Sequence, residues 1–123
     1  MEKFHCRSAE RPKRKAKLLK KELAAFGYDL KLQKCQNVIA MMYGFRHLSD
    51  LYDHIGLFGT SPDDESVDGA CFKERFWFQS AKLMEIGVRQ HVAEEIIDRV
   101  RPTSTSFKVA AKMPNQTTFQ DRA

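Results

Sequence analysis

The sequence has only three cysteines, and their positions follow no regular spacing. This scarcity argues against the disulfide framework that small secreted domains use, and it predicts a reducing, cytoplasmic location. No Cys-x-x-Cys pair occurs, and no two histidines lie four residues apart. We therefore expect no metal site, and we expect Cys35 and Cys71 to be small core residues.

Long apolar runs are also missing, since no stretch approaches the roughly 18 residues that a membrane-spanning helix needs. Residues 1–7 lack the apolar segment of a signal peptide, so no secretion signal is expected. Alternation of β-branched residues is nearly absent, which argues against a sheet of any size. With 42% hydrophobic and 30% charged residues, the chain has the balance of a globular protein. These features predict an all-α protein with no membrane partner.

Apolar residues recur at helical spacing, and in the first such segment Ala16, Leu19 and Leu23 share one face. The predicted helices cover residues 12–26, 32–43, 47–55, 70–86 and 89–100. The expected fold is a compact all-α bundle of about five helices with a disordered C-terminal tail. We expect a single helical domain at 12–101, preceded by a flexible lead-in at 1–11 and followed by a flexible tail at 102–123. Within the domain, an acidic loop at 59–69 joins the halves 12–58 and 70–101.

Charge is distributed unevenly, although the net charge is only +5. Residues 1–34 hold eleven Lys/Arg and four Asp/Glu, whereas residues 35–70 hold one Arg and six acidic residues. Such asymmetry is informative about partners rather than about fold. One interpretation of the basic block is a solvated helix start that aids solubility, and the other is a phosphate-contacting element. The candidate phosphate contacts are Arg11, Lys13, Arg14, Lys15, Lys17, Lys20 and Lys21, with Lys31, Lys34 and Arg46 in support.

The segment around Tyr43–Phe45 has the outline of a helix-turn-helix motif. The helix that follows, at 46–54, offers one Arg and two Asp, which is a poor set for reading bases in a major groove. The basic block holds no interleaved aromatic residue, so stacking on bases is not expected there. Any binding of nucleic acid should therefore tolerate different sequences and be sensitive to salt.

No arrangement of residues indicates catalysis. His5 and Cys6 are adjacent, but no third group that would orient them is marked by the sequence. The acidic run at 63–65 lacks the spaced oxygen ligands of a calcium loop, so a solvated loop is expected there. No glycine-rich phosphate loop is present. We expect no catalytic residues, no cofactor and no enzymatic activity.

Four aromatic residues are packed into seven positions between 72 and 78. One helix cannot bury all of them on one face, since positions 76, 77 and 78 span about 200° around its axis. We expect this helix to be central and covered by neighbours, and the alternative is that one ring is exposed as an anchor for a partner. The candidate partner-binding residues are Phe72, Phe76, Trp77 and Phe78.

Residues 16–51 combine two apolar helices, a short link and a Gly-Phe-Arg step. The residues of this pattern are Lys17–Leu19, Leu23, Gly27–Tyr28, Leu30, Gln33, Gln36, Ala40, Tyr43–Arg46 and Leu51. The pattern resembles the glyoxalase-related short helical domain of small bacterial and mobile-element proteins. It departs from that family at the link 30–32, which is not Ser/Thr-rich, and at Leu48, where the family has Trp. The resemblance implies a helical fold and a bacterial or mobile-element origin, but no glyoxalase reaction.

The sequence therefore predicts a small non-enzymatic binding protein that acts through contacts with another protein. Attraction between the basic first helix and acidic groups, or between the acidic region 50–68 and basic ones, would orient such a contact. The alternative is a nucleic-acid-binding or regulatory protein that uses the basic residues between Arg11 and Lys21. A second copy of the chain is a further candidate partner, since an exposed aromatic patch can make a homodimer.

Overall fold

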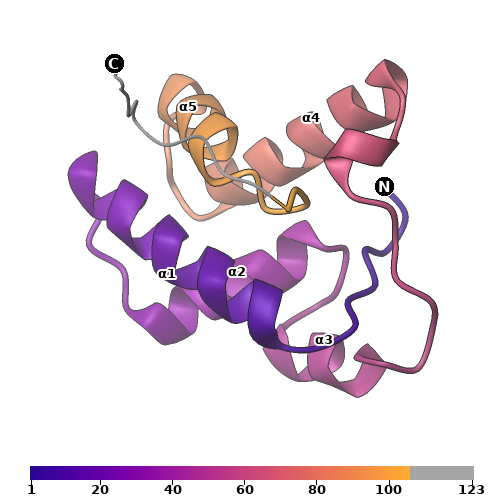
Figure 1. Cartoon of the computed structure of the whole chain (residues 1–123). Helices are drawn as coiled ribbons and strands as arrows, with labels where there is room; N and C mark the ends of the chain where they lie inside the picture. Colours follow the sequence, from indigo (N-terminus) through magenta and orange to yellow (C-terminus); the bar gives the residue numbers. More distant parts are fainter. Residues whose placement is uncertain (106–123) are drawn as a thin grey trace, which may run out of the picture.

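The computed structural model of the protein describes residues 1–105, and within them it contains five α-helices and no strand (Figure 1). The elements are α1 (Glu10–Ala25), α2 (Leu32–Met42), α3 (Leu48–His54), the short 3-10 helix η1 (Asp64–Ser66), α4 (Gly69–Glu85) and α5 (Gln90–Val100). The all-α bundle is confirmed, and each α-helix begins and ends within two residues of its predicted bounds. None of these helices has the length and apolarity needed to cross a bilayer.

The helix ends follow from local sequence. Gly27 and Gly87 lie two residues after the ends of α1 and α4, with φ angles of 91° and 101°, a conformation that glycine adopts at little cost. At the start of α4, a side-chain oxygen of Asp68 accepts the backbone N–H of Cys71 at 2.8 Å, which caps that helix.

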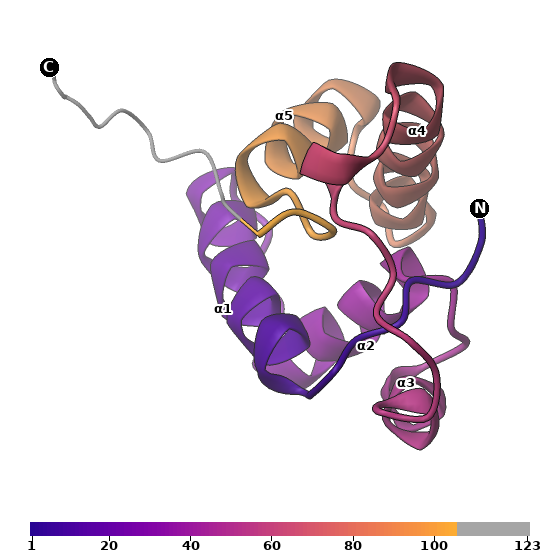
Figure 2. The same ribbon diagram turned by 45° about the vertical axis from the view of Figure 1, so that its right-hand side comes forward.

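The centre of the bundle is α2, which packs against α1, α3 and α4 (Figures 1 and 2). Its side chains Cys35, Val38, Ile39 and Met42 are fully buried. The expectation that the aromatic-rich α4 is central is therefore wrong. It packs on α5 and α2 at one side of the molecule and leaves one face to solvent, because a run of three consecutive aromatics cannot face one core.

The N-terminal segment is packed rather than frayed, which corrects the expectation for residues 1–11. The ring of Phe4 is buried against Tyr43, with ring centroids 5.0 Å apart, and its backbone N–H donates to the Tyr43 carbonyl oxygen at 2.8 Å. The guanidinium groups of Arg11 and Arg75 lie over the same ring. One large apolar side chain is enough to hold this irregular segment to the bundle, and a single residue leaves no periodic pattern in the sequence.

The first residues of the predicted tail are also part of the bundle. Pro102, Thr103 and Ser104 are buried, and the Tyr43 hydroxyl donates to the Pro102 carbonyl oxygen at 2.7 Å. The expectation of a flexible tail is thus wrong for residues 102–104. Its remainder, 106–123, lies outside the described residues.

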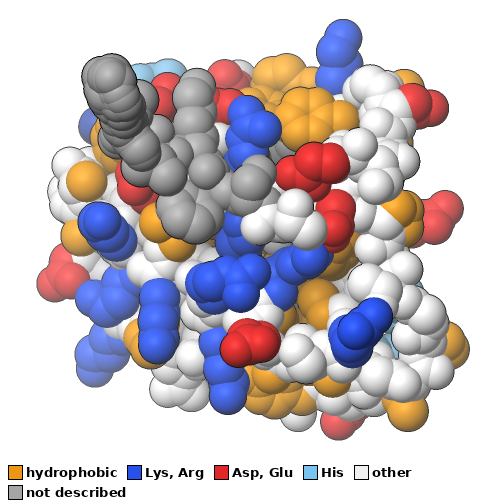
Figure 3. Space-filling model, viewed as in Figure 1, with side chains coloured by type: hydrophobic (Ala, Val, Ile, Leu, Met, Phe, Trp, Pro, Cys, Tyr) orange, Lys and Arg blue, Asp and Glu red, His pale blue; other side chains and the backbone are white. Residues whose placement is uncertain are grey.

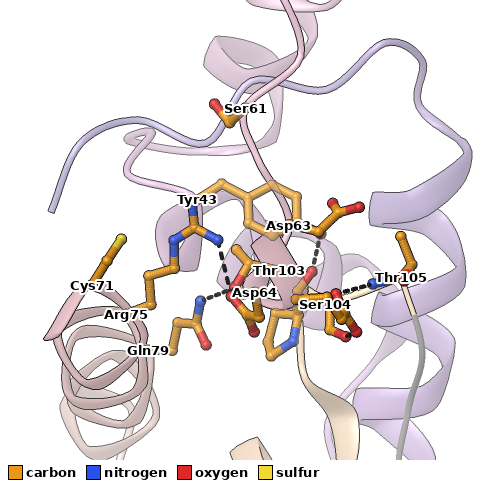
Figure 4. A network of polar contacts seen from close by, with 12 residues as sticks. Tyr43, Ser61, Asp63, Asp64, Cys71, Arg75, Gln79, Thr103, Ser104 and Thr105 are labelled. Atoms are coloured by element: carbon orange, nitrogen blue, oxygen red, sulfur yellow. Dashed lines mark hydrogen bonds and ion pairs between the residues drawn. The ribbon is translucent and has the colours of Figure 1, made fainter. Parts of the chain in front are cut away.

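Polar contacts explain why this segment is held (Figure 4). One carboxylate oxygen of Asp64 accepts from the Arg75 guanidinium at 2.9 Å and from the Thr103 hydroxyl at 2.7 Å, and Gln79 donates to the same hydroxyl. Asp63 binds Arg11 in the same region, and Glu65 accepts from Ser104. The acidic run at 63–65 is therefore structural and partly buried, not the solvated loop expected from its composition.

Candidate functional site

The helix α1 has two chemically different faces. Toward the bundle it buries Pro12, Ala16, Leu19 and Leu23. Toward solvent, exposed basic residues recur at intervals of four, at Lys13, Lys17 and Lys21, and Arg14 lies beside the first of them. Figure 3 shows Lys and Arg side chains gathered on the face of the molecule that α1 occupies.

Most of these cations pair with no acidic residue of the described part of the chain. The ion pairs of α1 there are that of Arg11 with Asp63 and that of Glu22 with Arg99 of α5. The cations near α1 that form no ion pair within residues 1–105 are Arg7, Lys13, Arg14, Lys17, Lys20 and Lys21. We call these six residues the basic face. Their charges are uncompensated locally, so they attract anions from solution.

The basic face extends to the seam with α2. Burial raises the pKa of the Cys35 thiol on α2, and the nearby charge of Lys20 opposes that rise. Lys31 and Lys34, at the start of α2, are exposed. Lys31 and Lys34 therefore add two exposed cations outside α1.

Three of the predicted phosphate contacts are placed differently from the others. Lys15 is 1% exposed, and its ammonium donates to the Val100 carbonyl oxygen at 2.9 Å, so the prediction that it contacts phosphate is wrong. It lies on the apolar side of α1, where its long stem packs and its charged end finds the last turn of α5. Arg11 is half-buried and binds Asp63. Arg46 is on the connection before α3, where it pairs with Asp50.

The α3 helix does not have the features of a recognition helix. It has seven residues, and none of them is Arg, Lys, Asn or Gln. Its buried Asp50 accepts the backbone N–H of Arg46, and this hydrogen bond lowers the pKa of the carboxyl. Helix α3 therefore offers acidic and apolar groups where base reading needs donors and cations.

The four aromatic residues of α4 are separated by the fold. Phe72, Phe76 and Phe78 are half-buried, whereas Trp77 is 54% exposed and meets Phe76 edge to face. Met84 was not among the predicted partner-binding residues. It is 43% exposed and lies seven positions after Trp77, on the same side of α4. The i, i+7 spacing is the signal that would have identified it.

The sequence analysis did not identify a second group of exposed apolar side chains, in the turn after α3. Leu57 and Phe58, between Gly56 and Gly59, are 68% and 57% exposed. The Phe58 ring lies 5.0 Å from that of His5. Two large apolar residues enclosed by glycines are the sequence signal that marks a protruding turn here.

Within residues 1–105, no group of three or more His, Cys, Asp or Glu side chains is arranged to hold a metal ion. No family model, no curated protein and no solved structure matches this chain. The properties of its own surface are therefore the basis for a functional hypothesis.

Proposed function

We propose that this protein is a non-enzymatic binding protein that binds the phosphate backbone of nucleic acid through the basic face of α1. The observation that carries the proposal is the set of six cations near α1 that form no ion pair within residues 1–105. Surface lysines that serve only solubility are commonly interspersed with acids. The two acidic residues of α1 are Glu10, in its first turn, and Glu22, which pairs with Arg99 of α5.

The size of the basic face suits a nucleic-acid duplex. Lys13 and Lys21 are eight residues apart, which corresponds to about 12 Å of helix at 1.5 Å per residue. With both strands counted, duplex DNA carries one phosphate charge per roughly 1.7 Å of its axis, so a stretch of this length holds about seven phosphates, and the basic face can contact those on the near side. Because no aromatic residue lies on the basic face, stacking on unpaired bases adds nothing, and a duplex is the favoured form.

The proposal is tested with a fluorescently labelled DNA duplex, by anisotropy titrations at several salt concentrations. We expect affinity to fall steeply with salt. The variant Lys17→Gln/Lys21→Gln should reduce the slope of log affinity against log salt by about 2, at roughly 0.9 per lost phosphate contact. The matched control is Lys73→Gln/Arg89→Gln, which removes the same charge from exposed positions outside the basic face, on α4 and directly before α5.

The control should bind DNA with the slope of the unmodified protein. Absence of binding at low salt would exclude the proposal. So would an equal loss in both variants, because that result would attribute binding to net charge rather than to the basic face.

A second function, binding of another protein through α4, is favoured by a different observation. Trp77 and Met84 are both exposed and lie seven positions apart, on one side of α4. Exposed Trp is a frequent energetic anchor of protein interfaces. Trp77 is also the only tryptophan of the chain, so its fluorescence reports on this surface directly.

Association of this kind is tested by sedimentation and by the emission of Trp77 across a wide protein concentration range. A blue shift with concentration, lost in Met84→Lys, would support pairing of two copies through α4. A constant emission and a monomeric mass would exclude self-association.

A further inference from the structure

The basic face ends at a pocket. It lies where the N-terminal segment enters α1, has a volume of about 330 Å³, and is at the lower end of the size range of small-molecule sites. Its lining comes from both sides of that junction and from the loop after α3. The lining residues are Cys6, Arg7, Ser8, Glu10, Arg11, Arg14 and Thr60.

One arginine of the pocket is held in place by its neighbours. The Arg11 guanidinium donates to Asp63 on one side and lies 5.7 Å from the centre of the Phe4 ring. A guanidinium carries five N–H donors, and the bond to Asp63 occupies one of them. Arg11 can therefore bind an anion at a small entropic cost, because its position is already fixed.

The other two arginines of the pocket, Arg7 and Arg14, are exposed and form no ion pair within the described residues. Arg14 follows Arg11 by three positions, which places both on one side of α1. The pocket thus combines one oriented guanidinium with two free ones.

The remaining lining groups suit an anion with several oxygens. Ser8 and Thr60 supply hydroxyl groups. Burial raises the pKa of the Cys6 thiol to about 11, so at neutral pH this group carries no negative charge. Glu10 is the one acidic residue of the lining. Arg is the residue best suited to bidentate recognition of phosphate oxygens.

From this geometry we propose that the pocket binds a phosphate monoester, and that its source is the terminal 5′-phosphate of a nucleic-acid strand lying along the basic face. A terminal phosphate carries more negative charge than a backbone phosphodiester, and a concave site with three guanidinium groups favours it. The shared chemistry of the ligand is the phosphoryl dianion, and assignment to a strand end rests on the proposed function. Free inorganic phosphate is the other source, and the test separates the two.

The experiment compares two DNA duplexes of one sequence, one with 5′-phosphates and one with 5′-hydroxyls, at constant ionic strength. We expect the phosphorylated duplex to bind about tenfold more tightly, which corresponds to about 1.4 kcal/mol. The substitutions Arg7→Gln and Arg14→Gln should each reduce that preference. Both side chains are exposed, so the circular dichroism and melting temperature of the variants should match those of the unmodified protein.

The matched control is Lys17→Gln, which removes one charge from α1 outside the pocket. It should weaken binding of both duplexes by the same factor. In parallel, inorganic phosphate replaces chloride at constant ionic strength, and the backbone amide resonances of residues 6–14 are followed by NMR. Saturable shifts confined to these residues are expected, and they should vanish in Arg14→Gln.

The outcomes distinguish the phosphate pocket from the proposed binding of a nucleic-acid duplex. Duplex binding without a 5′-phosphate preference and without phosphate-dependent shifts would overturn the pocket and leave the proposed function in place. Saturable phosphate shifts without duplex binding would keep the pocket, overturn its assignment to a strand end, and remove the proposed function.

Discussion

The ammonium of Lys15, on α1, donates a hydrogen bond to the carbonyl oxygen of Val100, the last residue of α5, at 2.9 Å. This contact joins two residues, on different helices, that are 85 positions apart in the chain. Lys15 is buried, whereas most of the other basic residues in the same part of the sequence are exposed. The basic block therefore has two parts, since Lys15 packs inside the bundle and most of its neighbours form the surface.

The burial of Lys15 predicts an unusual dependence of stability on pH. Burial, together with the positive charges of Arg14 and Arg11, lowers the pKa of Lys15 from 10.5 to about 8. Above about pH 8 the folded chain loses this proton while the unfolded chain keeps it, so the free energy of unfolding rises with pH. Burial of Cys6 acts in the opposite sense, because it raises the pKa of that thiol from 9.0 to about 11.

Burial also raises the pKa of the Cys35 thiol. From about pH 9 the unfolded chain loses the protons of both thiols while the folded chain retains them, which outweighs the single proton of Lys15, and stability falls. The melting temperature should pass through a maximum near pH 9, measured by circular dichroism between pH 7 and 10.5. In Lys15→Met the rise between about pH 8 and 9 should disappear. A melting temperature that declines steadily from pH 7 in the unmodified protein would contradict this assignment.

Asp64 should be the acidic residue whose charge contributes most to stability. Its side chain and that of Arg75 are each 8% exposed, and Asp64 also accepts from the Thr103 hydroxyl. Removing one partner of a buried ion pair leaves the other uncompensated, at a cost of about 3–5 kcal/mol. We expect Asp64→Asn to lower the free energy of unfolding by about 3 kcal/mol in urea denaturation.

The matched comparison is Arg46→Gln, which breaks the pair with Asp50. The Arg46 side chain is 82% exposed, and exposed pairs contribute about 0–1 kcal/mol. Equal costs for the two substitutions would mean that the Asp64 network is not buried in solution.

Gly44 tests whether the N-terminal segment is packed in solution. Its φ is 92°, and a Cβ atom there would lie 3.3 Å from the Cα of Lys3. Gly27 has nearly the same φ, 91°, but no atom lies within 4 Å of its Cβ position. Both alanine substitutions carry a backbone cost of about 1 kcal/mol or more. Gly44→Ala should cost measurably more than Gly27→Ala in urea denaturation, and equal costs would show that residues 1–4 do not pack at this site.

Truncation of two residues of α4 should lower the free energy of unfolding by very different amounts. Leu83 is fully buried, so Leu83→Ala should lower the free energy of unfolding by about 2–5 kcal/mol. Trp77 is more than half exposed, so Trp77→Ala should cost about 1 kcal/mol or less. A large cost for Trp77→Ala would show that this ring is covered in solution.

The helices could be predicted from the sequence because their signals are repeated. In α1, three apolar residues at helical spacing and a following glycine all indicate the same element, so a single exception does not obscure it. The same argument holds for α5, where Val92, Ile96 and Val100 recur at intervals of four and are all buried.

Single long-range contacts were not predictable. Phe4 is one aromatic in an irregular segment, and Thr103 is one hydroxyl in a Ser/Thr-rich stretch, yet each is buried by a partner far away in the chain. Lys15 was grouped with the exposed lysines because composition does not show which residue of a basic block faces the core. For Trp77 the angular argument correctly left two outcomes, and the open face of α4 decides between them.

The most direct test of the central claim is an NMR titration of the full chain with a short DNA duplex at low salt. The account predicts that the backbone amides of Lys13, Lys17 and Lys21 shift and saturate, while the indole N–H of Trp77 stays in place. Shifts at Trp77 with none on α1, or no shifts at all, would contradict it.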